Sequence, residues 1–507
     1  MVIDFLQHDA LAVADLIRRK EISPRDAVQA SINRIEALNP RLNAVVHQMF
    51  DRALATADNE IPDGPFRGVP FLLKDLTALY EGEPITSGSR LFKGWVAPYD
   101  SEMTRRYKRA GLIVVGKTNT PEFGLVPFTE SELLGICRNP WNPAVTTGGS
   151  SGGSGAAVAS GMVPMADGGD GGGSLRIPAS CCGVFGLKPT RGRTPTGPMQ
   201  GELWRGATVE HVITRSVRDC AAMLDAVAGP DVGAPYYAPP PARPFLQEVK
   251  TPPGRLRIAF TTDPMLGRSV HPDCIAAVND AAKLLASLGH DVVEDTPVID
   301  RESFNRAFLT VVCCETAAEL YEAATVLRRP VKRSDVEVAT WALALIGRSI
   351  SGPEYTRAVR YLQRMSRRIG EFFERYNVHV SPVVAGPPFP HGALQPPGGE
   401  KTLMSILGAL RASSVLKALG ALERAAGTVF EWMSFTPIAN ATGQPAMSVP
   451  LSWNPDGLPI GVHVTGRYAD EATLFRLAAE LELAAPWREK KPPEQEAGSR
   501  RQEAGSD

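Results

Sequence analysis

A glycine-rich stretch at residues 146–178 constrains the possible folds of this chain more than any other feature. Between positions 148 and 173, 11 of 26 residues are glycine, whereas the whole chain has 47 glycines in 507 residues. This core of the stretch has no aromatic residue, and its only charged residues are Asp167 and Asp170. Glycine permits positive φ and close backbone approach. The composition therefore predicts two Gly-rich turns, flanking a small-residue run and a short strand at 162–166, that present N–H groups and serine hydroxyls to a ligand.

The composition of the whole chain restricts its partners and its compartment. The formal net charge is −1, which gives no electrostatic argument for binding nucleic acid or an anionic membrane. Seven cysteines, an odd number without framework spacing, indicate reduced thiols and a cytoplasmic location. The N-terminus lacks the pattern of a secretory signal, and no run of about 18 apolar residues predicts a membrane span.

Helical and strand patterns alternate along the chain, which predicts the α/β class. Strands are expected at 43–49, at the apolar run that ends in Lys74, and at 112–115, 256–260, 291–294, 377–384, 446–451 and 460–465. Helices are expected at 4–19, from the N-cap Ser23 to Asn39-Pro40, at 51–57, 100–110, 217–227 and 271–288, over most of 302–376, and at 402–427 and 470–484.

Two segments do not fit this alternation. Residues 229–255 carry eight prolines, which predicts an extended surface connection and marks the best candidate for a subdomain break. Residues 489–507 are polar and charged without periodicity, so we expect a disordered tail.

Two phosphate-binding motifs compete for the glycine stretch, and neither fits it. A P-loop requires a Gly-Lys-Ser/Thr sequence, but no lysine occurs between positions 118 and 187. A dinucleotide-binding fingerprint requires a helix after its glycines, and Pro178 is expected to end such a helix early.

A serine hydrolase elbow, Gly-x-Ser-x-Gly, does match the stretch around Ser150 and around Ser151. The elbow requires a strand directly before its serine, whereas residues 139–143 are predicted to be a loop. It also requires a histidine partner, and neither His211, His379 nor His463 lies in a recognisable triad context.

A neutral lysine can replace histidine as the base of a serine nucleophile. Lys74 ends a buried strand, and we interpret it as the only lysine whose context lowers its pKa by desolvation. In isolation, the same pattern also fits a lysine whose stem follows the strand while its ammonium stays in water. The residues alone leave four candidate nucleophiles, Ser150, Ser151, Ser154 and Ser174, and the glycines before Ser174 are candidate oxyanion donors.

The glycine stretch and further segments of the chain resemble a known family, the amidase signature family. The matching segments are Gly148-Gly-Ser-Ser-Gly-Gly-Ser154, Asp170-Gly-Gly-Gly-Ser-Leu-Arg-Ile-Pro178, Gly186-Leu-Lys-Pro189, Gly68-Val-Pro70, Lys74-Asp75, Gly116-Lys-Thr-Asn119, Asn440-Ala-Thr-Gly-Gln-Pro445 and Gly457-Leu-Pro-Ile-Gly461. The resemblance covers about 1–488 and implies a single domain with its signature core at roughly 65–230. It also implies an α/β fold whose large, mixed, twisted central sheet has helices on both faces.

The resemblance implies a Ser–cis-Ser–Lys triad and no cofactor or metal. Carried over by motif position, Ser174 is the nucleophile, Ser150 the relaying serine and Lys74 the base. The oxyanion is then bound by the N–H groups of Gly171, Gly172, Gly173 and Ser174. Supporting roles, bracing the loops without reacting, fall to Ser151, Ser154, Asp170 and Arg176.

Within the family, the segment around Ser174 departs from the Ser/Thr-Asp-Thr-Gly-Gly-Ser pattern usual in the glutaminase component of tRNA-dependent amidotransferases. It looks more like stand-alone amidases, including aryl acylamidases and the hydrolases of the cyclic nylon dimer of 6-aminohexanoate. We therefore expect a hydrolase of apolar or aryl amides, with esters, carbamates and oligoamides as further substrates. Its partners are a small-molecule amide and water, and it is a monomer or homodimer. A glutaminase-type component of a tRNA-dependent amidotransferase is the alternative, and a catalytically dead binding protein is a third reading that the intact Ser and Lys residues oppose.

The substrate pocket is the least constrained part of this prediction. Cys313 and Cys314 lie where the nylon-oligomer branch carries a pocket cysteine, although two buried thiols on a helix give the same pattern. The Pro/Gly loop at 386–399 and the apolar residues of 402–435 are candidates for its wall. The apolar residues are Leu403, Met404, Ile406, Leu407, Phe430, Trp432 and Met433.

Overall fold

The computed structural model describes residues 3–395, 427 and 429–493. Its main feature is an eleven-stranded mixed sheet with the order β1-β3-β2-β6-β8-β7-β12-β13-β11-β9-β10. Its strands are β1 (Val45–Gln48), β2 (Pro70–Lys74), β3 (Ile113–Thr118), β6 (Met165–Asp170), β7 (Phe185–Lys188), β8 (Val209–Thr214), β9 (Arg257–Phe260), β10 (Asp291–Glu294), β11 (Val378–Pro382), β12 (Ala446–Trp453) and β13 (Pro459–Gly466). A separate two-stranded pair consists of β4 (Glu130–Ser131) and β5 (Gly135–Ile136).

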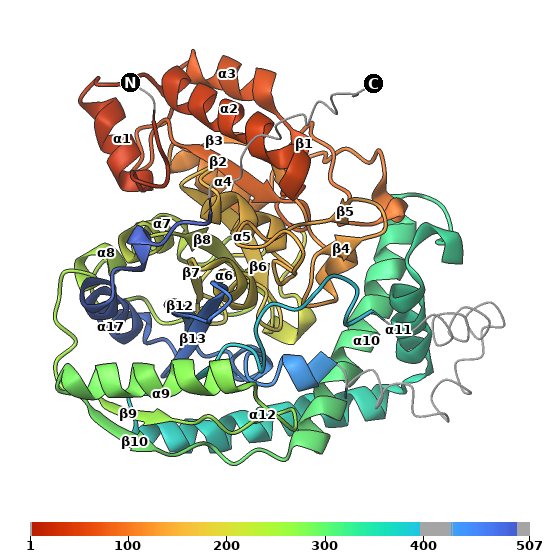
Figure 1. Cartoon of the computed structure of the whole chain (residues 1–507). Coiled ribbons are helices and arrows are strands. Elements are labelled where there is room, and N and C mark those ends of the chain that lie inside the picture. Colours follow the sequence, from red (N-terminus) through yellow and green to blue (C-terminus); the bar gives the residue numbers. More distant parts are fainter. Residues whose placement is uncertain (1–2, 396–426, 428, 494–507) are drawn as a thin grey trace, which may run out of the picture.

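The helices surround this sheet. They are α1 (Ala10–Arg18), α2 (Pro24–Leu42), α3 (Phe50–Ala57), α4 (Glu102–Arg109), α5 (Gly152–Ala159), α6 (Arg176–Cys182), α7 (Val217–Val227), α8 (Phe245–Glu248), α9 (Pro272–Ser287), α10 (Arg301–Val326), α11 (Val338–Ser349), α12 (Gly352–Arg375), α16 (Pro437–Thr442) and α17 (Glu471–Ala484). Figure 1 shows α1, α2 and α3 at one end of the molecule and β9, β10 and α12 at the opposite end.

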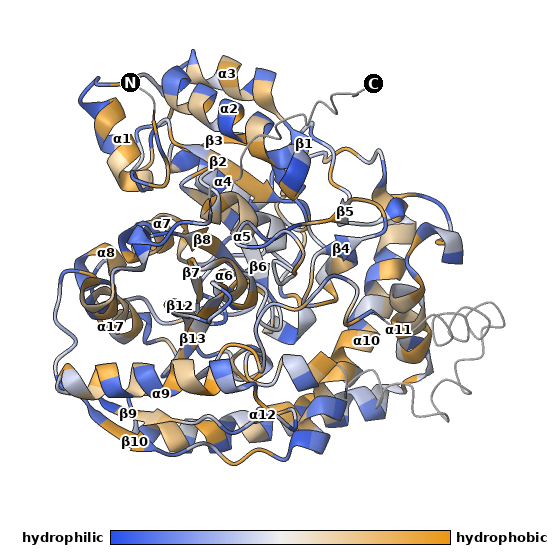
Figure 2. Ribbon diagram, in the orientation of Figure 1, coloured by the Kyte–Doolittle hydropathy of each residue, from blue (hydrophilic) through white to orange (hydrophobic). Residues whose placement is uncertain are grey.

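Both faces of the central strands are buried, as predicted. Phe71, Leu73 and Met165 enter one core with residues of α1, α4 and α7. Leu72 and Ala166, which alternate with them along β2 and β6, enter a second core with residues of α2, α3, α5 and α6. Successive side chains of a strand point to opposite faces, so helices cover this part of the sheet on both sides. Farther out, α9 alternates between hydrophilic and hydrophobic residues, as expected for a helix at the surface (Figure 2).

The first two helices differ from the predicted bounds. The first begins at Ala10 rather than at residue 4, because the side chain of Asp9 accepts a hydrogen bond from the N–H of Ala12 and caps it. The second has the predicted cap at Ser23 but continues through Pro40. It ends at Leu42, where Asn43 adopts a left-handed conformation and donates its N–H to the Asn39 carbonyl.

The glycine stretch was predicted to form turns, and six of its eleven glycines do lie outside helices and strands, among them both glycines of 148–149 and all three of 171–173. The other five lie inside α5 and β6. Gly152 and Gly153 begin α5, and the predicted strand at 162–166 starts only at Met165 and runs through Gly168 to Asp170. A Cβ at Gly152 would lie 2.2 Å from Thr129 Oγ1, and one at Gly168 would lie 2.7 Å from Leu175 Cδ2. These glycines therefore permit close packing of buried elements.

Pro178 does not end the helix that follows the second glycine cluster. It is the third residue of α6, and the first turn of a helix tolerates proline because its N–H has no intrahelical partner. The helix thus begins directly after Ser174 and Leu175.

The remaining predictions agree with the structure to within a few residues or fall outside it. The Pro-rich connection at 229–255 contains only the short helix α8, and the single-domain assignment stays a prediction. The predicted helix at 402–427, apart from its last residue, and most of the predicted tail at 489–507 lie outside the described residues. Within the described ranges, none of the helices combines the length and the apolar character that a membrane span requires.

Candidate active site

Lys74 is the last residue of β2 and lies deep inside the protein. Its side chain is 1% exposed, between the neighbouring strands β3 and β6. Its Nζ donates a hydrogen bond of 2.7 Å to Ser150 Oγ. Burial lowers the pKa of Lys74 to about 8. The alternative interpretation, with the ammonium in water, is therefore wrong, and the neutral form of Lys74 is far more accessible near neutral pH than that of an exposed lysine.

Ser150 lies in the first glycine cluster, just before α5. Its side chain is 2% exposed, and the peptide bond between Gly149 and Ser150 is cis. A Cβ at Gly149 would lie 2.6 Å from the backbone nitrogen of Phe128. The backbone of a neighbouring loop thus leaves no room for a side chain at position 149, directly before Ser150.

Ser174 lies between β6 and α6, in the second glycine cluster, and shares a cavity with Lys74 and Ser150. Among the described residues, the N–H groups of Gly171, Gly172 and Ser174 have no hydrogen-bond acceptor. The N–H of Gly173, one of the four predicted to bind an oxyanion, is already engaged, since it donates to Asp170 Oδ1 at 2.8 Å. Three free N–H groups remain at this turn.

The Asp170 carboxylate holds this turn together with a buried guanidinium. Arg176 is fully buried and donates from Nε and Nη2 to the two carboxylate oxygens, at 2.9 and 2.8 Å. Burial alone raises the pKa of Asp170, but the charge and hydrogen bonds of Arg176 outweigh burial and hold the pKa well below its usual range. Asp170 and Arg176 thus form a fixed ion pair behind the turn, which is the bracing geometry predicted for them.

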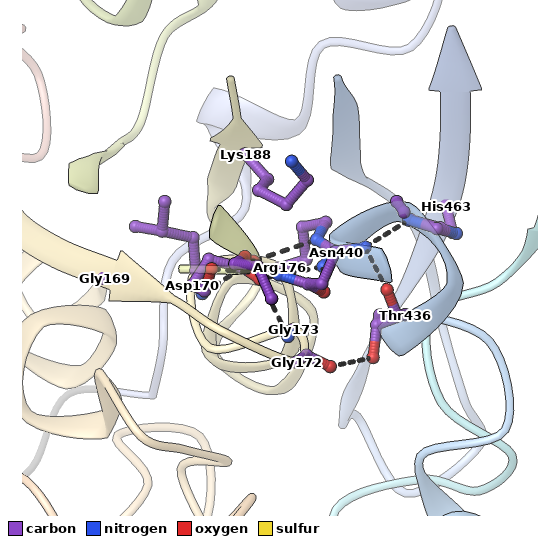
Figure 3. Close-up of polar contacts among 12 residues, drawn as sticks. Gly169, Asp170, Gly172, Gly173, Arg176, Lys188, Thr436, Asn440 and His463 are labelled. Atoms are coloured by element: carbon purple, nitrogen blue, oxygen red, sulfur yellow. Dashed lines mark hydrogen bonds and ion pairs between the residues drawn. The ribbon is translucent and has the colours of Figure 1, made fainter. Parts of the chain in front are cut away.

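Three residues of the C-terminal half complete this network (Figure 3). Asn440 Nδ2 donates to Asp170 Oδ1 at 2.8 Å, and the Asn440 amide oxygen accepts from Arg176. Thr436 Oγ1 donates to the Gly172 carbonyl at 2.7 Å, and His463 Nε2 accepts from Arg176 Nη1. Burial and the Arg176 charge lower the pKa of His463 well below its usual value, so His463 is a neutral acceptor and not a base.

Sequence reasoning gave no role to these three residues. Asn440 belongs to one of the segments that resemble the family, so the motif marked its importance but not its contact. Its partner Arg176 is 264 residues away in the chain, and spacing alone does not pair such residues.

The other two serines of the first cluster brace buried backbone. Ser151 Oγ contacts the carbonyl and the N–H of Gly169, at 3.2 and 3.3 Å. Ser154 Oγ donates to the Asp167 carbonyl at 2.6 Å. These contacts tie α5 to β6 and leave both hydroxyls away from the cavity that holds Ser150 and Ser174.

Lys74 is not the only lysine with a depressed pKa, contrary to our interpretation of the sequence. Burial lowers the pKa of Lys117 to about 8 and that of Lys188 to about 7. The Nζ of Lys117 donates to the Pro84 carbonyl, and that of Lys188 donates to the Pro189 carbonyl. Of these three buried lysines, Lys74 alone contacts a hydroxyl.

A set of buried acids lies behind Lys74. The Asp167 carboxylate accepts from the Lys74 backbone N–H at 3.0 Å and from the Tyr107 hydroxyl at 2.9 Å. Burial raises the pKa of Asp167 to about 6 and that of Glu210 to about 8. These acids add negative potential near Lys74, which limits how far burial depresses its pKa.

The cavity in front of the two serines, here called the central cavity, has a volume of about 170 Å³. Its apolar wall includes Phe308, Leu309 and Val312 of α10, together with Phe430 and Met433. The last two were predicted pocket residues. Trp432, a third, packs instead against Phe389, and Leu403, Met404, Ile406 and Leu407 lie outside the described residues.

The predicted pocket cysteines do not line this cavity. Cys313 is buried in a core with residues of α11, and the Cys314 Sγ points to the Gly347 carbonyl of the same helix. The helical period explains the error: the cavity-facing positions of α10 include 308, 312, 315, 319 and 322, and residues 313 and 314 lie on the face that packs against α11. Both faces of this part of α10 are covered, so hydrophobicity did not distinguish them.

The described residues contain no group of three or more His, Cys, Asp or Glu side chains arranged to hold a metal ion. The three histidines considered for a triad are all buried, and none lines the central cavity. At Ser174 itself, the groups within the cavity are hydroxyls, one lysine and free backbone N–H groups, which are the groups that acyl transfer requires.

Comparison with known proteins agrees with this geometry. A family model described as Amidase matches residues 26–475. A 6-aminohexanoate-cyclic-dimer hydrolase from Pseudomonas sp. (strain NK87) is 38% identical over 495 residues, which cover 96% of this chain and 97% of that protein. A solved structure of 6-aminohexanoate cyclic dimer hydrolase has a TM-score of 0.87 at 36% identity, covering 97% of this chain and 99% of that one.

Two further solved structures are more distant. A bacterial aryl acylamidase has a TM-score of 0.81 at 25% identity, covering 95% of this chain and 96% of that one. A glutamyl-tRNA(Gln) amidotransferase subunit from Thermotoga maritima has a TM-score of 0.71 at 26% identity, covering 96% of each chain.

Proposed function

The chain belongs to the amidase family, and we propose that it cleaves carboxylic amide C–N bonds through a covalent acyl-enzyme on Ser174. The observation that carries this proposal is the 2.7 Å hydrogen bond from Lys74 Nζ to Ser150 Oγ, in a cavity that Ser174 also lines. A depressed lysine pKa and a hydroxyl contact are what a lysine base requires.

In the proposed acylation step, the Ser174 oxygen attacks the amide carbonyl carbon. Its proton passes to Ser150, and the Ser150 proton passes to neutral Lys74. The negative charge that develops on the carbonyl oxygen is stabilised by the N–H groups of Gly171, Gly172 and Ser174.

The C–N bond then breaks. The proton held by Lys74 returns through Ser150 to the leaving nitrogen, and the acyl group stays on Ser174. Water attacks this ester in the second half-reaction, by the same relay, and releases the carboxylic acid. The relay uses Lys74 and Ser150 twice, so both half-reactions depend on them.

We propose apolar or aryl amides and oligoamides as the substrate class, with anilides, esters and carbamates sharing the chemistry. The apolar wall from α10 and the names of the relatives support this choice. The amidotransferase alternative is weaker, because the cyclic dimer hydrolases resemble the chain more closely in sequence and structure than the amidotransferase protein does.

The test uses the purified chain alone with a 4-nitroanilide of a medium-length carboxylic acid. We expect release of 4-nitroaniline by the native protein and a loss of roughly 10⁴-fold or more in Ser174→Ala. Ser287→Ala, which removes an exposed hydroxyl on α9, is the matched control and should keep full activity. Undiminished release by Ser174→Ala, or no release by the native chain from any amide, contradicts the proposal.

A further inference from the structure

The side chains that α10 contributes to the wall of the central cavity change from apolar to acidic along the helix. Phe308 and Val312 are apolar, whereas Glu315, Glu319 and Glu322 continue the same face of the helix at intervals of three and four residues. From Val312 to Glu319 the helix rises about 10 Å, which is comparable to an extended medium-length alkyl chain. The cavity thus passes from an apolar section to an acidic one.

The carboxylates of this acidic section, here called the acidic wall (Glu315, Glu319 and Glu322), have no cationic partner among the described residues. Glu315 accepts from the Tyr355 hydroxyl at 2.6 Å, and Glu322 accepts from the Gln200 amide at 3.3 Å. Glu319 has neither a hydrogen bond nor an ion pair in the part of the chain that the structure describes. Burial and the two flanking glutamates raise the pKa of Glu319 to about 8, so a cation bound beside it would favour its ionised form.

The cationic side chains near the cavity do not pair with the acidic wall. Arg205 is paired with Glu202, a residue of the cavity lining, at 2.5 Å. Lys74 is the one Lys or Arg among the described residues that line the cavity, and its Nζ donates to Ser150 Oγ and not to the acidic wall.

A second observation, on a strand outside α10, points to a missing hydrogen-bond donor. A side chamber of about 170 Å³ adjoins the central cavity and shares Leu76, Thr77 and Glu319 with it. Glu210 of β8 lines this chamber from the opposite element. Its side chain is only 5% exposed, yet its Oε2 has no hydrogen-bond partner among the described residues. A buried carboxyl oxygen without a partner is costly, and a donor that fills the chamber removes that cost.

We propose that the acidic wall binds a protonated amino group, so that the preferred substrates are amides bearing an alkylammonium at the end of an apolar chain. This rests on the proposed amide hydrolysis at Ser174. The apolar section holds the methylene chain, and the acidic wall, with Glu210 behind it, receives the ammonium. An ammonium has three donors and no acceptor, which matches a wall that offers carboxylate oxygens.

The test compares substrates that differ only in charge at the chain end. One pair is 6-aminohexanoyl-4-nitroanilide against heptanoyl-4-nitroanilide, with the ammonium on the acyl side. The other pair is N-hexanoyl-1,6-diaminohexane against N-hexanoyl-heptylamine, with the ammonium on the amine side. The readout is the ratio of kcat/KM within each pair, in which the amount of active protein cancels.

We expect the ammonium-bearing member of at least one pair to be preferred about tenfold or more by the native protein. Glu319→Gln keeps the shape of the side chain, removes the charge and should reduce that ratio toward one, mostly through KM. Glu315→Gln should reduce it less. Glu302→Gln, on the exposed first turn of the same helix, is the matched control and should leave the ratio unchanged.

Equal or better cleavage of the neutral member in both pairs overturns the inference, as does a preference that survives in both Glu319→Gln and Glu315→Gln. Failure of the proposed function looks different, because the native protein then cleaves neither member of either pair. Cleavage of heptanoyl-4-nitroanilide without a charge preference separates the two failures.

Discussion

Lys74 and Lys188 occupy equivalent positions in two strands of the same sheet, and they differ only in what their ammonium groups meet. Each is the last residue of its strand, each is at most 1% exposed, and burial lowers the pKa of each, to about 8 and about 7. Lys74 Nζ donates to the Ser150 hydroxyl inside the central cavity, whereas Lys188 Nζ donates to the Pro189 carbonyl. A hydroxyl can give its proton to a neutral amine and a carbonyl cannot. Burial makes a lysine neutral, but only the hydroxyl contact can make it a base.

The largest expected effect separates the two lysines by activity. Lys74→Met should lower the rate of amide hydrolysis at pH 7 by roughly 10²–10⁴-fold, because the general base is lost. Lys188→Met should stay within a few-fold of the native protein, since Lys188 does not line the central cavity. Initial rates on a 4-nitroanilide measure both, with circular dichroism confirming that each variant is folded. Equal losses of activity in the two variants would contradict the assignment of Lys74 alone as the base.

The pH dependence of acylation should also distinguish Lys74 from Lys188, with a smaller effect. Neutral Lys74 is the reactive form, so the acylation rate should rise about tenfold per pH unit below the pKa of about 8 and level off above it. Stopped-flow acylation between pH 6 and 10 measures this limb. Lys188→Met should keep the limb and Lys74→Met should lose it. A limb that survives in Lys74→Met assigns the titration to another group, with Asp167 and Glu210 as the first alternatives.

Stability gives the converse test, in which Lys188 has the visible effect. The pKa of Lys188 is about 7 in the folded protein and about 10.4 for an unperturbed lysine. Between these values the unfolded chain binds more protons, so the free energy of unfolding rises with pH. Native protein minus Lys188→Met should show this rise, at most about 1.4 kcal/mol per pH unit, because the contributions of Lys74 and Lys117 cancel in the difference. Urea unfolding at pH 7.5, 8.5 and 9.5 measures it, and a flat difference would show that Lys188 is not buried as described.

The smallest expected effect concerns the two cysteines of α10. Because Cys313 and Cys314 face α11 and not the central cavity, Cys314→Ala should change kcat/KM by less than about twofold. Cys313→Ala leaves a buried cavity, so it should lower the melting temperature without altering substrate preference. A change in substrate preference in either variant would contradict this placement and indicate that the thiols line the substrate pocket.

Much of the fold was predictable from local patterns. The strand β10 and the helix α7 have the bounds that the sequence indicates. The glycine stretch was harder, because a glycine that allows positive φ and one that allows close packing look the same in a sequence. Gly168 is an example, since its neighbour Leu175 is identified only by the folded structure.

The candidate site, too, was predictable from the sequence only in part. The motifs marked Lys74, Ser150 and Ser174, and the structure brings all three to one cavity. The network that holds the oxyanion turn was not predictable, because Asn440 and Thr436 approach it from more than 260 residues away. Burial alone does not identify the catalytic base, because three lysines are buried. Only the structure shows which of them contacts a hydroxyl.

The site of covalent labelling by a serine-directed acylating or sulfonylating reagent identifies the nucleophile directly. Native protein treated with phenylmethylsulfonyl fluoride near pH 8 is digested and mapped by tandem mass spectrometry. We expect a single modified residue, Ser174, with labelling that persists in Lys188→Met and is strongly slowed in Lys74→Met. Modification of Ser150 in place of Ser174, or labelling of Ser174 at an undiminished rate without Lys74, would contradict this expectation.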